Sequence, residues 1–285
     1  MADPQTVAPS LLSFAAVGAF VTTVGTLFGH YLKEAVLAKS FESWKKRQAL
    51  ETLYGKYRDP IVLSAIELAM RLNEACSEHP AEFLARRILS CTSPEPSHSS
   101  VRDPYYFRYK FQSTIYRFAA FLGWLELYRQ DLVFLNSRGS KKNTALQKLL
   151  NEIREDFAAG TLNCAKDWDC WSDALIFRED QRAVGEAMIT SVNGIRTVMG
   201  YGAFVTMFED TTSVGNKWLR VVTNFLIDPK KEKDFRLVRY QRLIIHLVDL
   251  VRTLDERRLP EALGAAAGRY VKEEGFRTES LQKLA

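Results

Sequence analysis

The residues best suited to acid–base or metal chemistry lie together near the C-terminal end of the chain. His246 and Asp249 are three positions apart on a predicted helix, and Arg239 and Arg242 precede them on a neighbouring face. An imidazole beside a carboxylate is typical of proton relays and metal sites. Two ligands are too few for a metal, however, and no nucleophile accompanies them. The pattern therefore favours a structural or solvated polar edge.

Two further segments gather polar and aromatic side chains. "DWDCWSD", residues 167–173, places Trp168 and Trp171 among three aspartates, where the ring faces could bind a cation or a peptide. Such tryptophans more often anchor an irregular loop onto a helical core. "FREDQRAVGE", residues 177–186, has arginines and acids at helix-pair spacing. It predicts either a solvated helix face or a partly buried arginine–carboxylate network between helices.

Other signals of chemistry are missing from the sequence. It has no glycine-rich phosphate loop, nucleophile elbow, HExxH or dinucleotide fingerprint, so we expect no cofactor and no metal, and an enzyme is not the favoured class. The four cysteines, Cys76, Cys91, Cys164 and Cys170, lack metal-site spacing and are interpreted as free thiols. The net charge of +5 is mild and not concentrated in one block. We therefore expect no nucleic-acid partner.

The N-terminal part of the chain contains a long run without charge. Between Asp3 and Lys33 there is no Asp, Glu, Lys or Arg, and most positions from Val7 to Leu32 are apolar, Gly, Ser or Thr. A membrane-crossing helix needs about 20 such residues. No basic residue precedes the run, which disfavours a cleaved signal peptide. The sequence predicts a transmembrane helix over 7–32, with a buried soluble helix as the alternative.

The charges flanking this run indicate its orientation. Lys39, Lys45, Lys46 and Arg47 follow it, whereas Asp3 is the one charged side chain before it. Basic residues beside a span stay on the cytoplasmic side, where they also face anionic lipids. We therefore expect residues 1–6 to be a short tail outside the cell and everything after Leu32 to be cytoplasmic.

Small residues recur along the predicted span. They are spaced three, four, three and four positions apart, which places them on one helical face. In lipid, close backbone approach along such a face drives helix association, so the stripe predicts a homo-oligomer. The members of this small-residue stripe are Ala15, Gly18, Thr22, Gly25 and Gly29.

The rest of the chain reads as helical. Residues 33–58 form a predicted juxtamembrane helix, and Asp59-Pro60 predicts the start of a second helix within a cytoplasmic domain of residues 59–285. Asp103-Pro104 and Asp228-Pro229 precede two more apolar helical repeats, and residues 91–103 form a predicted loop. Residues 198–208 are left open between strand and helix. The predicted fold class is all-α: an N-terminal transmembrane helix that continues into a multi-helix cytoplasmic bundle.

Three phrases of this sequence resemble a family of membrane-anchored helical proteins of unknown function. They are "YGKYRDPIVLSAIELAMRLNE", "STIYRFAAFLGWLELYR" and "LIFREDQRAVGEAMI", in this order after the apolar run. The resemblance spans most of residues 1–255 and implies that the span and the helical body belong together. It implies no activity, cofactor or site residue.

These observations lead to a functional expectation and two alternatives. The leading one is a single-pass membrane protein whose cytoplasmic domain binds an unidentified protein and self-associates without catalysis. The first alternative is a membrane effector that oligomerises and permeabilises the bilayer through its Gly/Ala/Thr-rich span. The second is an enzyme acting on a lipid or small molecule, which a deep polar cleft with convergent carboxylates would favour.

Overall fold

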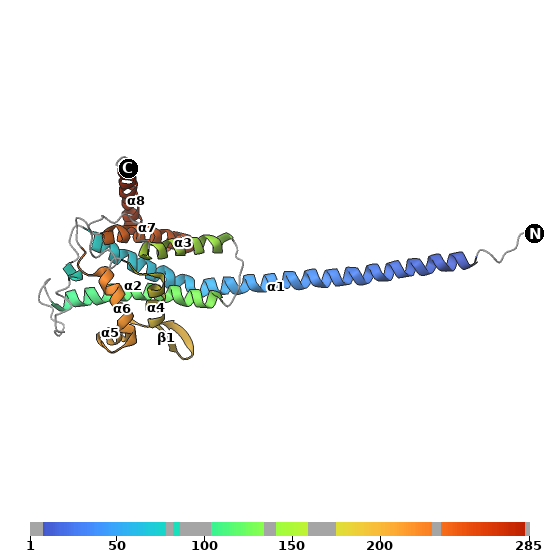
Figure 1. The fold of residues 1–285 in the computed structure, drawn as a ribbon, viewed down its shortest axis with the longest axis horizontal. Helices are drawn as coiled ribbons and strands as arrows, with labels where there is room; N and C mark the ends of the chain where they lie inside the picture. Colours follow the sequence, from blue (N-terminus) through green and yellow to red (C-terminus); the bar gives the residue numbers. More distant parts are fainter. Residues whose placement is uncertain are drawn as a thin grey trace, which may run out of the picture. The chain divides into compact units, whose positions relative to one another are not determined.

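A computed structural model describes residues 8–77, 82–85, 104–133, 141–158, 175–229 and 235–282. The chain divides into two compact units, residues 1–52 and 53–285. The described residues are predominantly helical, so the predicted all-α class is confirmed (Figure 1). The predicted tail over residues 1–6 and the predicted loop over 91–103 lie outside the described residues.

The elements follow one another along the chain with short connections. Their bounds are α1 (Ala8–Cys76), η1 (Glu82–Leu84), α2 (Pro104–Val133), α3 (Lys141–Ala158), α4 (Arg178–Ala187), β1 (Ile189–Val192), β2 (Ile195–Val198), α5 (Tyr201–Glu209), α6 (Val214–Leu226), α7 (Phe235–Asp255), η4 (Glu256–Arg258) and α8 (Glu261–Gln282).

The helix boundary predicted at Asp59-Pro60 is wrong. Helix α1 includes Pro60 in its interior instead of beginning there. Proline has no N–H, so the carbonyl of Lys56 loses its helical hydrogen bond at this point. The flanking side chains Tyr57, Ile61 and Val62 are buried, and their packing holds the backbone helical despite that loss.

In the second unit, the last six turns of α1 lie antiparallel to α2. Tyr57 donates a hydrogen bond to Asp131 at one end of the pair, over 2.6 Å. Near the other end Arg71 donates to Ser113 over 3.3 Å, and Lys110 pairs with Glu74. The apolar stripe predicted for α2 is buried against this helix and its other neighbours, which confirms the 3.6-residue pattern there.

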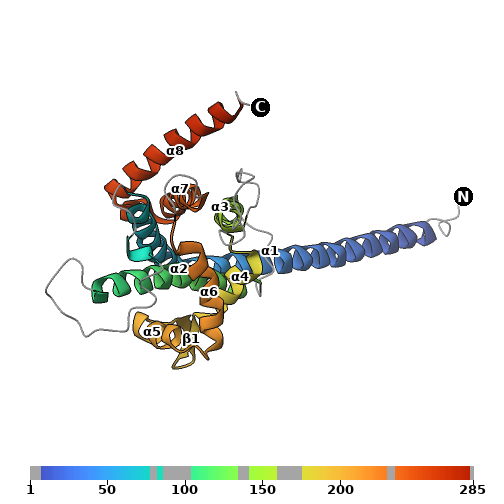
Figure 2. The same cartoon turned by 60° about the vertical axis from the view of Figure 1, so that its left-hand side comes forward.

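An aromatic cluster joins four helices of the second unit. The ring of Phe118 in α2 lies 5.0 Å from that of Phe157 in α3 and 5.5 Å from that of Phe225 in α6. Tyr240 of α7 stacks against Phe225 at 5.3 Å and donates a hydrogen bond to its carbonyl. Helices α3 and α7 lie side by side in both views of the ribbon (Figure 2).

A β-hairpin is the feature of the described residues that the all-α prediction did not include. Strands β1 and β2 pair antiparallel, with Ile189 opposite Val198. Asn193 and Gly194 form the turn, both with positive φ, which is the geometry that Asn-Gly favours in two-residue hairpins. Residues 201–209, left open between strand and helix, are helix α5.

Candidate functional site

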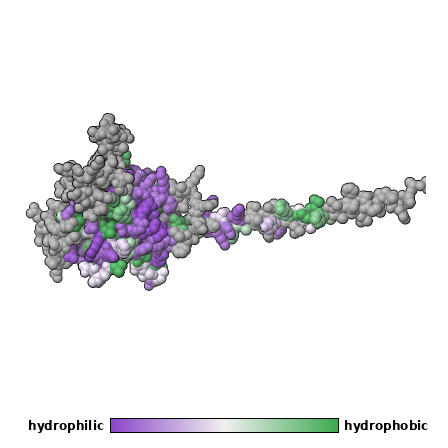
Figure 3. All heavy atoms as spheres, in the orientation of Figure 1, coloured by the Kyte–Doolittle hydropathy of each residue, from purple (hydrophilic) through white to green (hydrophobic). Residues whose placement is uncertain are grey.

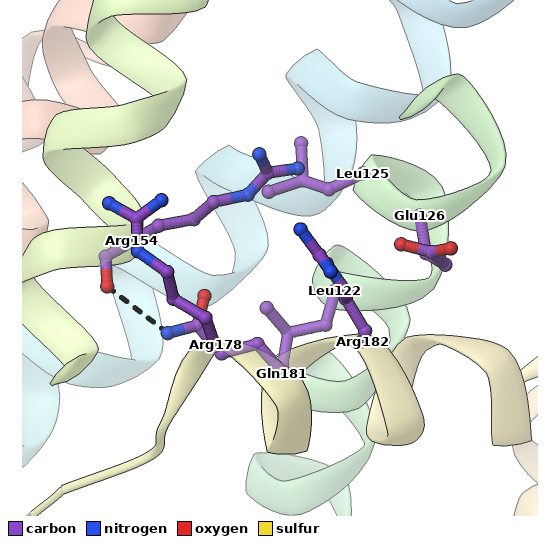
Figure 4. Close-up of a pocket in the computed structure, with 7 residues that line it drawn as sticks. All are labelled: Leu122, Leu125, Glu126, Arg154, Arg178, Gln181 and Arg182. Carbon is purple, nitrogen blue, oxygen red and sulfur yellow. Dashed lines mark hydrogen bonds between the residues drawn. The ribbon is translucent and has the colours of Figure 1, made fainter. Parts of the chain in front are cut away.

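Three arginine side chains meet in a small pocket between α2, α3 and α4. Arg154 extends from α3, whereas Arg178 and Arg182 come from the first turn of α4 (Figure 4). The free volume is about 20 Å³, which accommodates a water molecule. We call this site the arginine pocket; its lining residues are Leu122, Leu125, Glu126, Arg154, Arg178, Gln181 and Arg182.

Two of the charges beside the pocket are neutralised by neighbours. Glu126 is buried and accepts hydrogen bonds from Arg129, over 2.7 Å from Nε, and from Gln130, over 2.7 Å. Arg178 pairs with Glu155 of α3. The arginine–carboxylate network that residues 177–186 predicted as one alternative is therefore present between helices.

Next to the pocket, Asp156 of α3 is the centre of a second polar cluster. Its side chain is 3% exposed, and its carboxylate lies 2.5 Å from Nδ1 of His246 and 3.4 Å from Nε of Arg242. The Asp156 carbonyl accepts a hydrogen bond from the buried Arg239 over 2.8 Å. These contacts fasten α3 to α7 through charge as well as through apolar packing.

The predicted neighbours His246 and Asp249 face different partners. His246 binds Asp156, whereas Asp249 pairs with Arg252 over 3.0 Å on the surface of α7. Burial of the His246 imidazole acts to lower its pKa, but the hydrogen bond and charge of Asp156 outweigh that effect and raise the pKa. The cluster is thus a charged clamp between two helices, in line with the structural interpretation of these residues.

A larger cavity of about 350 Å³ lies between α2, α5 and α6. Glu209 is its one acidic residue within the described part of the chain, and Arg108 holds that carboxylate over 2.8 Å while Gln112 donates to it over 3.1 Å. The other lining residues are Phe111, Phe208, Thr211, Asn216, Arg220 and Thr223. A carboxylate engaged in this way is poorly placed for general acid–base work.

In the first unit, α1 exposes large apolar side chains. Phe20 is 70% exposed and Phe28 62% exposed, with Val21, Val24 and Tyr31 also exposed (Figure 3). Of the small-residue stripe, Thr22, Gly25 and Gly29 are exposed on this helix, whereas the side-chain positions of Ala15 and Gly18 lie outside the described residues. Lys39, Lys45 and Arg47 are exposed further along; the side chain of Lys46 is not described.

The threonines of this helix bond to their own backbone. Thr22 donates to the carbonyl of Ala19 over 3.0 Å, Thr23 to the same carbonyl over 2.7 Å, and Thr26 to that of Thr22 over 2.9 Å. Their hydroxyl groups are therefore satisfied within the helix and need no water.

Several predicted residues cannot be compared with the structure. Trp168 and Trp171 lie outside the described residues, as do Cys91, Cys164 and Cys170. Cys76 is a free thiol, as predicted, and burial beside Glu273 raises its pKa to about 12. A thiol with so high a pKa is protonated and unreactive at neutral pH.

Arg154 and Asp156 are the site residues that the sequence analysis missed. Both belong to "NEIREDF", where Ile153 and Phe157 form the buried face of α3. An acid between two core positions is a weak signal of a buried ion pair, because surface helices carry acids at every position. The partner helices are not visible from this segment alone.

Two searches within the structure and three comparisons complete the description. Within the described residues no group of three or more His, Cys, Asp or Glu side chains could hold a metal ion. Among those same residues, no helix is both long enough and apolar enough to cross a membrane. No family model, curated protein or solved structure matches the chain.

Proposed function

We propose that this chain is a single-pass membrane protein that self-associates through its N-terminal helix and presents a helical, non-enzymatic interaction domain at the cytoplasmic face. The observation that carries the proposal is the exposed apolar surface of α1 around Phe20, Val24 and Phe28. Water opposes such exposure at about 25 cal/mol per Å² of apolar area. A bilayer or a second copy of the helix removes that area from water.

The sequence of the whole run supports the same proposal. Residues 4–32 carry no charged side chain, and the part over residues 1–18 lies beyond the described side chains. Tyr31 is exposed at the end of the run and Lys33 follows it, which is the order of aromatic and basic residues at a membrane interface.

The threonine hydrogen bonds favour an anchor over a permeabilising cluster. A water-lined pore needs polar groups that are free to bond to water, whereas a lipid-facing threonine has to satisfy its hydroxyl within the helix. Thr22, Thr23 and Thr26 each do the latter. The membrane effector is therefore the second candidate.

The larger cavity provides no support for the enzyme alternative. A lipid or small-molecule enzyme would be favoured by carboxylates that converge on a polar cleft. The one described carboxylate in that cavity, Glu209, is held by Arg108 and Gln112.

The membrane proposal predicts where the full-length chain fractionates. We expect it to sediment with membranes after an alkaline wash and to need detergent for release. A Phe20→Lys, Val24→Lys double variant should move to the soluble fraction, because each lysine costs about 2.5–3.5 kcal/mol at the centre of a span. A Gln48→Lys variant, beyond the charge-free run, should fractionate like the natural chain.

Recovery of the natural chain in the supernatant without detergent would contradict the membrane proposal. Orientation is measured separately with single cysteines in a background lacking the natural ones. A cysteine at position 5 should react with an impermeant label outside intact cells, and one at position 140 should not. The reverse labelling would mean that the helical domain lies outside.

Self-association is tested on the small-residue stripe. A side chain at Gly25 or Gly29 meets no other atom within 4 Å, so leucines there fit the single helix without collision. We expect a Gly25→Leu, Gly29→Leu variant to insert normally and to lose cross-linked dimers, because close backbone approach is blocked. The matched variant Val24→Leu, Phe28→Leu should cross-link like the natural chain. Equal cross-linking by both variants would show that the stripe is not an interface.

A further inference from the structure

The arginine pocket contains two cations without a partner. Neither the Arg154 nor the Arg182 guanidinium makes a hydrogen bond or ion pair with any residue in the described ranges. Figure 4 shows both groups extending into the space between α2 and α4. Arg178 lies at the rim, where its side chain is 42% exposed and pairs with Glu155. An arginine that is partly buried and unpaired is costly to a fold unless an anion compensates it.

The surroundings of Arg154 increase this cost. Burial lowers the pKa of Arg154, and the charges of Arg182, Arg129 and Arg178 lower it further, against the single opposing carboxylate of Glu126. Glu126 is itself held by Arg129 and Gln130. The pocket is therefore a place of excess positive charge, and an anion within it would relieve the repulsion.

Gln181 supplies an independent sign of a ligand. The residue is 4% exposed, and its side-chain nitrogen donates to the carbonyls of Arg154, over 3.1 Å, and Ile176, over 2.9 Å. These two bonds fix the orientation of the amide. Its Oε1 is buried, accepts no hydrogen bond from the described residues, and points toward the middle of the pocket (Figure 4). An occupant therefore needs a hydrogen to donate as well as oxygens to accept.

Helix α4 adds to the preference for an anion. Arg178 is its first residue, and the preceding Phe177 offers no side-chain cap, so the first-turn N–H groups have no capping acceptor from that position. The positive end of a helix dipole attracts phosphate and other oxyanions.

We propose that the arginine pocket binds a phosphate group, as hydrogen phosphate or a phosphomonoester, between the guanidinium groups of Arg154 and Arg182. Tetrahedral phosphate presents several acceptor oxygens to guanidinium donors. Its protonated oxygen donates to Oε1 of Gln181. Sulfate has the same shape and charge but no hydrogen at neutral pH, and a carboxylate has two oxygens and no hydrogen. Free phosphate, a soluble phosphomonoester and a phosphatidic acid headgroup share the required chemistry.

The test measures thermal unfolding of the full-length chain at constant ionic strength, in detergent if it is needed. We expect low millimolar phosphate to raise the melting temperature relative to chloride and sulfate to raise it less. Arg154→Gln and Arg182→Gln should each weaken the phosphate response about tenfold or more, because each removes charged hydrogen bonds. Arg182→Lys should retain part of it. Arg257→Gln, at an exposed position outside the pocket, removes the same charge and should respond like the natural chain.

A second readout separates loss of binding from loss of folding. In chloride alone, Arg154→Gln and Arg182→Gln should melt at or above the temperature of the natural chain, because they remove a repelled cation. Equal responses to phosphate and sulfate, or a full phosphate response in the Arg154→Gln, Arg182→Gln double variant, would overturn the proposal. Parallel titrations with glycerol 3-phosphate and with micelles containing phosphatidic acid or phosphatidylcholine identify the source of the group.

Discussion

Replacing Gly185 with alanine is expected to destabilise the second unit by on the order of 3 kcal/mol. A Cβ at this position would lie 2.7 Å from the carbonyl oxygen of Leu122 and 2.8 Å from Cβ of Glu126. Both atoms belong to α2, and neither is the free end of a flexible side chain, so α4 has to move away. Thermal unfolding should show a melting temperature lowered by about 6–12 °C.

Gly55 provides the matched control for Gly185. It also lies within a helix, but a Cβ there meets nothing within 4 Å. Alanine should therefore stabilise the chain by about 0.5–1 kcal/mol, because glycine loses more backbone entropy in a helix. If Gly185→Ala melted at the same temperature as Gly55→Ala, the close approach of α2 and α4 would be wrong.

Replacing Asp156 with asparagine is expected to cost about 2–4 kcal/mol of unfolding free energy. The substitution removes the negative charge that His246 and Arg242 face, while it preserves the size of the side chain. Chemical denaturation of the full-length variant measures the loss. Asp249→Asn breaks an exposed pair with Arg252 and should change stability by less than about 1 kcal/mol.

The pH dependence of stability gives this prediction a second signature. Because Asp156 raises the folded pKa of His246, protonated His246 stabilises the folded chain. That contribution is complete below the ordinary histidine pKa of about 6.5 and is lost as pH rises through the folded pKa. His246→Gln should therefore cost most in mild acid and less above the folded pKa. A cost independent of pH would show that the imidazole makes no charged contact with Asp156.

Local patterns predicted the helices more reliably than their partners. The apolar repeat of Ile244, Leu247 and Val251 correctly placed α7, because burial on one face leaves a 3.6-residue period in the sequence. Asp59-Pro60 misled the analysis: proline is favoured at a helix start, but tertiary packing at Tyr57 and Ile61 outweighed one lost hydrogen bond. The turn residues Asn193-Gly194 were a readable signal for the hairpin.

The candidate site could not be read in the same way. Arg154 and Arg182 come from two helices, and no local period relates them. Asp156 and His246 lie 90 positions apart, so the spacing of His246 to Asp249 suggested a neighbour that α7 in fact directs elsewhere. A sequence shows which residue types are available on each helix face, whereas the pairing of faces depends on the packing of the whole bundle.

The aromatic cluster of Phe118, Phe157, Phe225 and Tyr240 has a consequence for synthesis of the chain. Each ring comes from a different helix, and more than 100 positions separate the first from the last. A nascent chain that has emerged only through α3 holds two of these rings and has nothing to cover them. The ribosome must release the chain beyond Tyr240 before the cluster can close. Until then, the exposed phenylalanines are a surface for chaperones to protect.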